Sequence, residues 1–548
     1  MTCMRARDIT DHALAHHMRL FGTDGVRGLV DLGAVEDPVQ AFITERRMTP
    51  SLLVRLASGM LSWIAERGIE SPLVVVGHDD RPNQDALIHA VTAVAKMAGA
   101  TCRVLGPCTT PHLVQTGLGM GASAMWMLTA SHNPASDSGL KWFDAEGRKS
   151  SPAMERFVES CLDVDIRGVF GTGGSVDLLG AETDSARTEA VVSSVGRLAD
   201  WLGIDVPMME PTPFLLDAAN GAAALGISEA LALMGLDVTR VDGIGVINDG
   251  CGASGFEPGQ HWIWADLAGE SHLLLTRLAA LSEVDRPAPG VPIAAALDGD
   301  GDRCILLETT ETGVCVVDGD RIATEVMAAA SPRRWRSALT IEADLAIAAE
   351  RLELGVDEDS LEVAVGDRWL GQALVGDGLA QSADWIGSED SGHLVMPWPH
   401  PTESGRWVPL GDGAGTLIAA LLARSTLSTS GRATAVESAG WKHRISIRGV
   451  DRNLWSPDSN LADVLERTLI DGLAELDPSV ELGRILVDGE PSLLMLRGTW
   501  AGIPTSVGVR PSGTEAKISV TCRMSRHPPH DASQIIEAMG DALEQALQ

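Results

Sequence analysis

The sequence predicts an α/β protein in which three similar α/β units, with parallel or mixed sheets, are followed by a different, α+β unit. Apolar strand patterns alternate with helical periodicities, and this alternation starts three times along the chain. With 548 residues the chain is too long for one hydrophobic core. Residues 435–548 instead combine several strand patterns with one final helix pattern, ASQIIEAMGDALEQAL, which is typical of an α+β domain.

The first unit is predicted from residues 73–129. LVVVG (73–77) is a short apolar run that ends in glycine, as buried strands often do. ALIHAVTAVAKMAGA (86–100) has apolar residues at helical spacing, and TCRVLG (101–106) and SAMWMLT (123–129) are further strand patterns. This strand–helix–strand order favours parallel strands.

The alternation restarts at residue 213 and again at residue 320. In the second unit a helix pattern that runs to Met234 lies among strand patterns. Those strand patterns are PFLLDAANG (213–221), LDVTRVDG (236–243) and VPIAAALDG (291–299). The third unit comprises DRIATEVMAAA (320–330), SALTIEADLAIAAERL (337–352) and LEVAVG (361–366).

Stretches rich in glycine and hydroxyl residues are predicted to link the units. They are GVFGTGGS (168–175), TTETG (309–313) and RSTLSTSGRAT (424–434). The predicted division is a tail, 1–18, and four domains, 19–175, 176–312, 313–434 and 435–548.

The composition excludes several classes of protein. Lysine plus arginine number 42 and aspartate plus glutamate 75, so the formal net charge is −33, which repels nucleic acid and anionic membranes. The N-terminal segment lacks the apolar region of a signal peptide, and no apolar run is long enough to span a bilayer. The eight cysteines form no CxxC pair, so no disulfide framework or zinc site is predicted. We therefore expect a cytoplasmic protein that binds neither nucleic acid nor membranes.

The motif DGDGDR directly follows a strand pattern. Asp298, Asp300 and Asp302 alternate with glycines, which permit the tight bend that brings three carboxylates together. Such carboxylates repel one another unless a hard cation lies between them, and oxygen-only ligands indicate Mg²⁺ or Ca²⁺. An EF-hand is excluded because Arg303 and Thr309 stand where it needs glycine and glutamate. A solvated acidic turn is the weaker alternative, because open α/β sheets bind ligands at the carboxyl ends of their strands.

Ser131 lies in the segment LTASHNPASDSGLKWF. It follows a strand pattern, and Pro134 prevents regular strand from continuing. A serine on such a loop is either a nucleophile or phosphoryl carrier or part of an ordinary turn, in which Ser, Asn, Pro and Asp are common. Lys141 is close enough to reach the same pocket as a general acid or base, or as a phosphate partner.

The segment RPSGTEAK predicts an anion site in the last unit. Arg510 and Lys517 flank Ser512, Gly513 and Thr514. A glycine between hydroxyl residues, with its neighbouring backbone N–H groups, forms an anion nest, and arginine adds a bidentate clamp. A β-turn beside a surface arginine is the alternative interpretation.

Two other segments carry weaker signals. FGTDGVRG is a glycine-rich loop with Asp24 and Arg27. SEDSGH places Glu389, Ser391 and His393 on one short loop, an arrangement that suits sugar hydroxyls. Taken alone, this second segment is explained more simply as a polar surface loop.

Together the motifs resemble those of the α-D-phosphohexomutase family. FGTDGVRG, TASHNP, DGDGDR, SEDSGH and RPSGTEAK occur in the family's order and extend from about residue 20 to 520. The resemblance implies four domains around a central cleft, each with one loop facing it. It also implies an isomerase that interconverts a hexose 6-phosphate and a hexose 1-phosphate through a phosphoserine and a hexose 1,6-bisphosphate, as a monomer or homodimer.

The resemblance also implies a role for each matching residue. Ser131 would carry the phosphoryl group, arginines would stabilise it during transfer, and His132 and Lys141 would move protons. The implied catalytic residues are Ser131, His132, Lys141, Arg27 and Arg303. The implied Mg²⁺ ligands are Ser131, Asp298, Asp300 and Asp302. The implied substrate-binding residues are Glu389, Ser391, His393, Arg510, Ser512, Gly513 and Thr514.

Within the family, VINDGCGAS (246–254) and VGDR (365–368) resemble bacterial phosphoglucosamine mutases, which implies glucosamine 6-phosphate as the substrate. Asp390 departs from their usual GEQSGH loop, so a phosphoglucomutase or phosphomannomutase is the alternative. A non-catalytic phosphosugar-binding protein is less favoured, because every chemical residue is present. The chain is longer than these enzymes usually are, and insertions are predicted at 30–47, 254–290 and 396–408.

Overall fold

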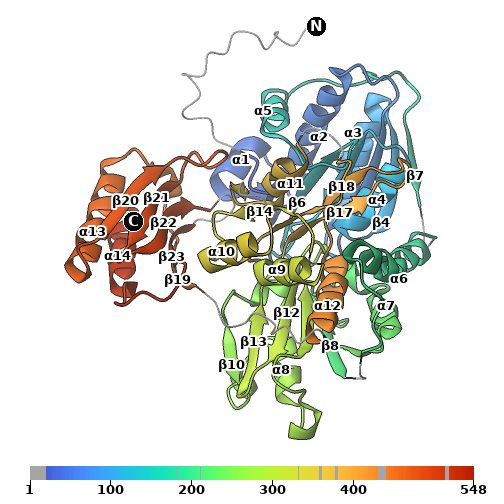
Figure 1. The fold of residues 1–548 in the computed structure, drawn as a ribbon. Helices are drawn as coiled ribbons and strands as arrows, with labels where there is room; N and C mark the ends of the chain where they lie inside the picture. Colours follow the sequence, from blue (N-terminus) through green and yellow to red (C-terminus); the bar gives the residue numbers. More distant parts are fainter. Residues whose placement is uncertain are drawn as a thin grey trace.

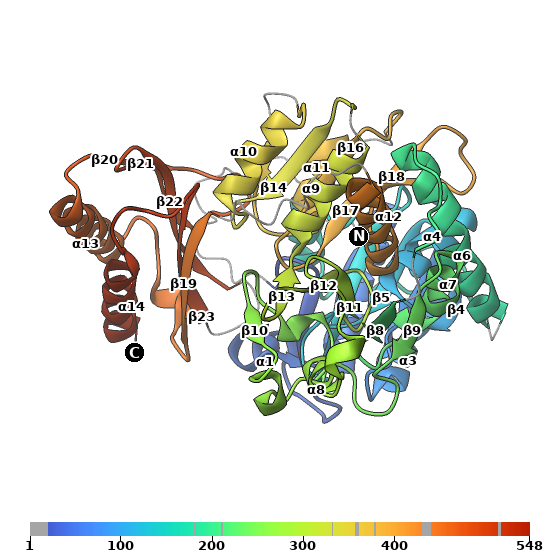
Figure 2. The same cartoon turned by 60° about the horizontal axis from the view of Figure 1, so that its bottom comes forward.

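The fold contains four β-sheets that follow one another along the chain (Figure 1). The computed structural model describes residues 20–179, 182–209, 212–330, 332–356, 361–376, 380–429, 440–512 and 517–547. Figures 1 and 2 show the blue, green and yellow parts packed together, with the red C-terminal part to one side. The prediction of a multi-unit α/β protein is therefore confirmed.

The first sheet has seven strands in the order β2-β1-β6-β5-β3-β4-β7. They are β1 (Val26–Val30), β2 (Arg47–Met48), β3 (Leu73–His78), β4 (Thr101–Pro107), β5 (Ala124–Leu128), β6 (Asp137–Asp144) and β7 (Ser175–Leu178). Strand β3 is parallel to β4 and β5, as predicted, whereas β6 runs antiparallel to β1 and β5. Strand β7 pairs with β4, so the chain returns to this sheet after the predicted linker 168–175.

Helices cover both faces of the first sheet. They are α1 (Pro38–Glu45), α2 (Pro50–Ala65), α3 (Gln84–Ala98), α4 (Thr110–Gly119) and α5 (Pro152–Ser160). Because successive strand residues face opposite sides, Val74 and Val76 of β3 join the apolar cluster under α2 and α3, while Val75 joins the cluster that contains α4. The predicted insertion 30–47 contains α1 and most of the link to β2.

The second sheet has six strands in the order β10-β13-β12-β11-β8-β9. They are β8 (Pro213–Asp217), β9 (Asp237–Arg240), β10 (His261–Ile263), β11 (Pro292–Leu297), β12 (Cys304–Thr309) and β13 (Gly313–Val317). The linker predicted at 309–313 is wrong, because β12 and β13 pair antiparallel and this stretch is the hairpin turn between them. Polar and glycine residues favour a hairpin turn as much as a linker. The helices of this region are α6 (Glu182–Leu202), α7 (Ile227–Leu233) and α8 (Leu273–Ala279).

The third sheet has five strands in the order β15-β14-β16-β17-β18. They are β14 (Arg336–Thr340), β15 (Leu361–Val363), β16 (Trp385–Ser388), β17 (Leu394–Pro399) and β18 (Trp407–Gly411). Its helices are α9 (Gly319–Ala329), α10 (Leu345–Glu353), α11 (Asp367–Val375) and α12 (Gly413–Thr429). The linker predicted at 424–434 is wrong in its first part, where α12 continues and buried Arg424 pairs with Glu308 and Glu325. Residues 430–434 lie outside the described residues.

The fourth sheet has five antiparallel strands in the order β19-β23-β22-β21-β20. They are β19 (Trp441–Arg448), β20 (Val480–Ile485), β21 (Leu494–Trp500), β22 (Ile503–Pro511) and β23 (Lys517–Met524). Helices α13 (Asn460–Leu476) and α14 (Ser533–Leu547) bury an apolar stripe each against this sheet, including Leu469 and Leu543. The predicted α+β character of this part is confirmed.

The apolar core distinguishes the first three units from the fourth. One continuous cluster contains Val75, Phe214, Trp335 and Ile418, so the three α/β units share it. The fourth unit has a cluster of its own. In the described part of the chain, no helix combines the length and the apolar character needed to cross a membrane.

Candidate active site

Loops at strand ends carry the predicted site residues. Ser131 lies between β5 and β6, the three aspartates between β11 and β12, Glu389 between β16 and β17, and Arg510 near the end of β22. The first three of these loops meet. Ser131 contacts Asp298, and Arg303 forms an isolated β-bridge with His393. The structure thus joins residues that are far apart in the sequence.

Ser131 is held in an unusual backbone conformation. Its φ is 54°, in the left-handed region that costs a non-glycine residue about 1–2 kcal/mol. The side chain is 1% exposed, and its Oγ donates a hydrogen bond of 2.8 Å to Asp298 Oδ2. The backbone N–H of Ser131 donates to Thr129 Oγ1 at 2.8 Å. This geometry favours the site interpretation over an ordinary exposed turn.

Arg81, which the sequence did not single out, fixes the carbonyls of this loop. Its guanidinium is buried and paired with Asp79 at 2.8 Å. It donates to the carbonyl oxygens of Ser131 at 2.6 Å and Asn133 at 2.9 Å, and also to those of Pro134 and Asp137. Strained conformations persist where the surroundings over-determine them, and Arg81 supplies that constraint.

The three aspartates form a compact buried cluster. Asp298, Asp300 and Asp302 are at most 1% exposed, and one ligand oxygen from each lies within 4.8 Å of the others. The Oδ1 atoms of Asp300 and Asp302 are buried and make no hydrogen bond to the described residues. Burial, and then the neighbouring Asp302 and Asp300, raise the pKa of Asp298. Unpaired carboxylate oxygens and a disfavoured negative charge are the features that a hard cation would satisfy.

Lys141 extends into this cluster from β6. Its Nζ lies 2.6 Å from Asp300, 2.7 Å from Asp302 and 2.8 Å from Asp24. Burial lowers the pKa of Lys141, but the three carboxylates outweigh burial and hold it well above its usual value. Thr110 Oγ1 donates to Asp300 at 2.6 Å. We call Ser131, Lys141, Asp298, Asp300 and Asp302 the charged centre.

Arg27, Arg303 and His132 border the charged centre. The Nε atoms of both arginines are buried and make no hydrogen bond to the described residues, so they are free to donate to an anion. Arg303 Nε is 3.8 Å from Asp298, and Arg27 Nη1 donates to the Ala130 carbonyl at 3.3 Å. Burial and then the two arginines hold the pKa of His132 well below its usual value, so its ring is neutral near pH 7.

The third unit presents the predicted sugar loop beside this centre. Glu389 is buried, accepts a hydrogen bond of 2.7 Å from the N–H of Gly366 and another of 3.2 Å from Ser391 Oγ. His393 Nε2 lies 3.1 Å from Asp367. Burial lowers the pKa of His393, but Asp367 and Asp302 outweigh burial and raise it to about 9. The loop is therefore buried and anchored, which a polar surface loop would not be.

Lys149 and Asp367 link the first and third units, and sequence analysis missed both as site residues. Lys149 Nζ lies 2.8 Å from Asp24 and 2.7 Å from Asp367, and Asp367 also contacts His393. Asp367 begins α11 and lies in the VGDR segment, which was noted only as a resemblance. No sequence signal distinguishes Lys149, whose role follows from the folded contact alone.

The phosphate loop of the fourth unit is only partly described. Arg510 Nε lies 2.9 Å from Glu490, and its Nη1 lies 3.7 Å from Glu342 of the third unit. The Ser512 N–H donates to the Lys517 carbonyl at 2.8 Å. Gly513 and Thr514 lie outside the described residues. The structure does not bring Arg510 into contact with the charged centre.

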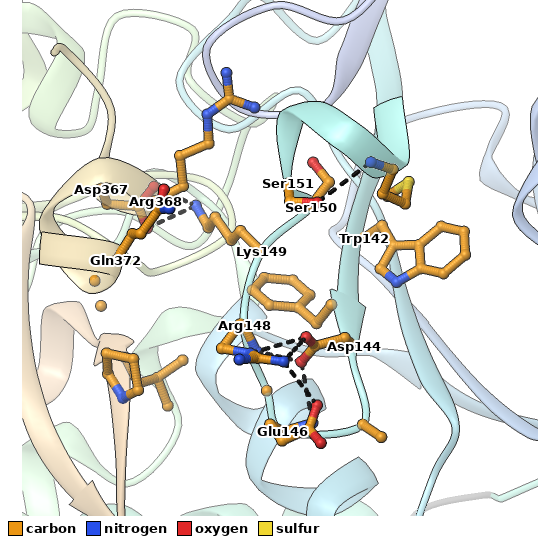
Figure 3. A pocket seen from close by; sticks show the side chains of 18 of the residues that line it. Trp142, Asp144, Glu146, Arg148, Lys149, Ser150, Ser151, Asp367, Arg368 and Gln372 are labelled. Atoms are coloured by element: carbon orange, nitrogen blue, oxygen red, sulfur yellow. Dashed lines mark hydrogen bonds and ion pairs between the residues drawn. The ribbon is translucent and has the colours of Figure 1, made fainter. Parts of the chain in front are cut away.

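A cavity of about 500 Å³ lies between the first and third units (Figure 3). Its lining includes Trp142, Arg148 and Gln372, and it reaches the surroundings of the charged centre through Asp302 and His393. Figure 3 shows Lys149 bonded to Asp367 on one wall and Arg148 bonded to Asp144 and Glu146 on another. This volume lies in the range of small-molecule sites.

Comparison with known proteins identifies the family. A family model described as phosphoglucomutase/phosphomannomutase, alpha/beta/alpha domain I, matches residues 18–165. The phosphoglucosamine mutase of Kineococcus radiotolerans is 30% identical over 546 residues, which cover 96% of this chain and 99% of that protein. The phosphoglucosamine mutase of Rhodococcus erythropolis is 31% identical over 389 residues, 69% of this chain and 75% of that protein. The chain belongs to the α-D-phosphohexomutase family.

The fold agrees with this assignment. The crystal structure of a phosphoglucomutase/phosphomannomutase family protein from Burkholderia thailandensis matches with a TM-score of 0.61 at 17% identity, covering 96% of this chain and 97% of that chain. As a phosphohexomutase, the chain is an isomerase that moves a phosphoryl group within a phosphorylated sugar. Asp298, Asp300 and Asp302 form a group that could hold a metal ion.

Proposed function

We propose that this phosphohexomutase converts glucosamine 6-phosphate to glucosamine 1-phosphate through phosphorylated Ser131 and a hexose 1,6-bisphosphate intermediate. One observation carries the proposal. Buried Ser131 Oγ lies 2.8 Å from Asp298, within a cluster of three carboxylates and the Lys141 ammonium. A hydroxyl in that setting is suited to carry a phosphoryl group rather than to make a routine turn.

The metal is proposed to be Mg²⁺. Asp298, Asp300 and Asp302 would hold it together with an oxygen of phosphorylated Ser131, and their oxygen-only, carboxylate-rich set fits a hard cation. The unbonded Oδ1 atoms of Asp300 and Asp302 support this fit. When bound, the ion offsets the negative charge that develops on the phosphoryl oxygens.

The chain's own residues would position the phosphoryl group and move the proton. In the first transfer the bond from Ser131 Oγ to phosphorus breaks, a bond from a sugar oxygen to that phosphorus forms, and the sugar hydroxyl gives up its proton. In the second transfer the other sugar oxygen–phosphorus bond of the bisphosphate breaks, that phosphorus bonds to Ser131 Oγ, and the freed sugar oxygen takes up a proton. His132, whose buried Nδ1 makes no hydrogen bond to the described residues, would accept the proton of the sugar hydroxyl, and Lys141 would protonate or neutralise the freed Ser131 oxygen. Arg27 and Arg303 would donate their free Nε–H groups to the phosphoryl oxygens.

The remaining assigned residues would bind the two ends of the substrate. Glu389, Ser391 and His393 would bind sugar hydroxyls, and this accords with their buried loop beside the charged centre. Arg510 and Ser512, together with Gly513 and Thr514, would hold the non-reacting phosphate. We propose four domains, one for each sheet, with the second extending through Val317. A cytoplasmic location and a monomer or homodimer complete the proposal.

The identity of the substrate sugar is proposed from the relatives and from the sugar loop. Both relatives reported above are phosphoglucosamine mutases, which supports the amino sugar. Asp390, in place of the usual glutamine, keeps glucose or mannose phosphate as the second candidate. Its carboxylate pairs with Lys442 of the fourth unit at 2.5 Å. The sugar loop therefore forms an ion pair here that a neutral glutamine at this position would not form.

A ³¹P NMR time course tests the proposal. The enzyme, with Mg²⁺ and a trace of hexose 1,6-bisphosphate, is given glucosamine, glucose or mannose 6-phosphate in separate samples. We expect the glucosamine compound to give its 1-phosphate fastest. A clear preference for glucose or mannose phosphate would support the second candidate, and no conversion of any of the three would contradict the mutase proposal.

A further inference from the structure

The loop after β9 brings a side chain of the second unit onto the Ser131 loop. Asn248 Nδ2 donates to the Ser131 carbonyl at 2.7 Å and to the Asn133 carbonyl at 3.0 Å. These are the same two carbonyls that accept from Arg81 of the first unit. The Ser131 loop is therefore held from two units at once, through the same pair of oxygens.

Asn248 also contacts the loop that bears the aspartates. A Cβ atom added to Gly299 would lie 3.0 Å from Asn248 Nδ2 and 2.7 Å from Ile247, so this part of the DGDGDR loop packs closely against residues 247 and 248. Asn248 thus lies between the loop of Ser131 and the loop of Asp298. We propose that Asn248 is a positioning residue, whose amide sets the placement of Ser131 relative to the aspartate cluster for phosphoryl transfer.

The residue type fits this task. Asn248 has a φ of 58°, a left-handed conformation that asparagine tolerates better than most residues. Its NH₂ group has two hydrogens, which match the two carbonyl acceptors. Aspartate at this position would place a carboxylate against the same two oxygens and would donate to neither. The contact therefore depends on an amide.

The loop that carries Asn248 is itself anchored in the second unit. The backbone N–H of Asn248 donates to the Ala219 carbonyl at 3.0 Å, and that of Gly252 donates to Asp217 at 2.8 Å. Asn220 Nδ2 donates to the Val246 carbonyl at 3.2 Å. A side chain on such an anchored loop can transmit the position of the second unit to Ser131.

The inference rests on the proposed function, and its test separates the two. Asn248→Gly, Asn248→Ala and Asn248→Asp are compared with wild type. The glycine variant removes the amide without adding left-handed strain, so it isolates the hydrogen bonds. Asn83→Ala is the matched control, because Asn83 also has a left-handed φ of 67° but is exposed and makes no side-chain capping bond.

Three quantities are measured on the full-length protein: kcat and KM, the rate of Ser131 phosphorylation by hexose 1,6-bisphosphate from intact mass, and amide hydrogen exchange of residues 129–137. We expect the Asn248 variants to lose on the order of 10²-fold in kcat and in phosphorylation rate, because small misplacements of reacting groups cost about this much. KM should change less than about twofold, and exchange of 129–137 should accelerate. Asn83→Ala should match wild type.

Unchanged kcat and phosphorylation rate in Asn248→Gly and Asn248→Asp would overturn the inference. A lowered melting temperature with normal kcat in these variants would also overturn it, because Asn248 would then have only a structural role. Activity in Asn248→Gly but not in Asn248→Ala would also overturn it, since backbone strain would then explain the loss. If wild type converts no phosphosugar, the proposed function fails. Hydrogen exchange would still decide whether Asn248 holds the Ser131 loop.

Discussion

The charged centre and the arginine-bearing loop of the fourth unit are built in different ways. Ser131, Lys141 and the three aspartates are at most 2% exposed, and contacts from separate units fix them. Arg510 is 17% exposed and meets carboxylates that are also partly exposed, Glu490 and Glu342. The centre is thus assembled within the shared core, whereas Arg510 belongs to a unit with a core of its own.

The contact between the third and fourth units explains why Arg510 lies among partly exposed carboxylates. A small apolar cluster contains Ile341 of the third unit with Leu493 and Met495 of the fourth. Ion pairs also join the two units, among them Lys442 with Asp390 and Arg497 with Glu362. Partly exposed ion pairs contribute little net stability and can exchange partners. The proposed reacting groups are therefore positioned in advance, whereas Arg510, the proposed phosphate-binding cation, is held by carboxylates that a substrate phosphate could replace.

The largest expected effect comes from removing the proposed phosphoryl carrier. Ser131→Ala should lower kcat by at least roughly 10³-fold, since alanine has no hydroxyl to carry the phosphoryl group. Conversion is followed by ³¹P NMR, and incorporation of phosphate by intact mass. Ser136→Ala is the control, because Ser136 is exposed on the same loop. Retention of phosphate incorporation in Ser131→Ala would place the carrier elsewhere.

The second effect tests the aspartate cluster. Asp300→Asn should lower kcat by about 10²-fold to 10³-fold, because it removes one proposed metal ligand and the carboxylate partner of Lys141 and Thr110. Activity and melting temperature are measured over a Mg²⁺ titration, where wild type should be activated and stabilised by the ion. Exposed Asp285→Asn is the control. An Asp300→Asn variant with the Mg²⁺ dependence of wild type would refute the metal site.

The third prediction concerns Arg510 in the fourth unit. Arg510→Ala should raise KM by roughly 10-fold to 100-fold and change kcat less than about threefold, since a charge-assisted phosphate contact is lost without disturbing the reacting groups. Arg484→Ala removes an arginine from the same sheet whose partners, Asp463 and Glu466, lie in α13, and it should leave KM unchanged. A loss confined to kcat would assign Arg510 to the chemical step and erase the contrast between the two regions.

The smallest expected effect concerns Glu342, one of the carboxylates that hold Arg510. Glu342→Gln removes a carboxylate that attracts Arg510 and lies near Arg444. We expect KM to fall by about two- to fivefold, because the substrate phosphate would no longer compete with this charge. The effect should shrink in high salt, which screens exposed charges. A rise in KM comparable to that of Arg510→Ala would show that Glu342 positions the arginine instead of competing for it.

The sequence predicted local elements and chemical motifs well for physical reasons. The strands around 73–129 are buried, so the sequence shows them as apolar runs. The three aspartates of DGDGDR would repel one another in an ordinary turn, so an ordinary turn explains their pattern poorly. Residues that act through distant contacts escaped prediction. Arg81 and Lys149 belong to ordinary polar segments, and Asn248 lies in VINDGCGAS, which was noted only as a resemblance. The fold alone shows that their partners lie in other loops.

Turns and long-range ion pairs were also not predictable from the sequence. TTETG has the composition of a linker and of a hairpin turn, and the pairing of β12 with β13 decides between them. Residues 424–429 look like a linker because of their hydroxyls, yet Arg424 finds two buried carboxylates and the helix continues. The carboxylates beside Arg510 could not be foreseen, because Glu342 lies far away in the sequence.

The contact between Ser131 and Asp298 spans 167 positions of the chain, and that between Lys141 and Asp300 spans 159. This spacing has a consequence for biosynthesis, because units fold in order as they leave the ribosome. Of the three carboxylates that pair with Lys141 in the folded protein, only Asp24 has been synthesised before residue 300 is reached. The charged centre is therefore completed late in translation, and a product that ends before residue 298 carries Ser131 and Lys141 without the three aspartates they contact.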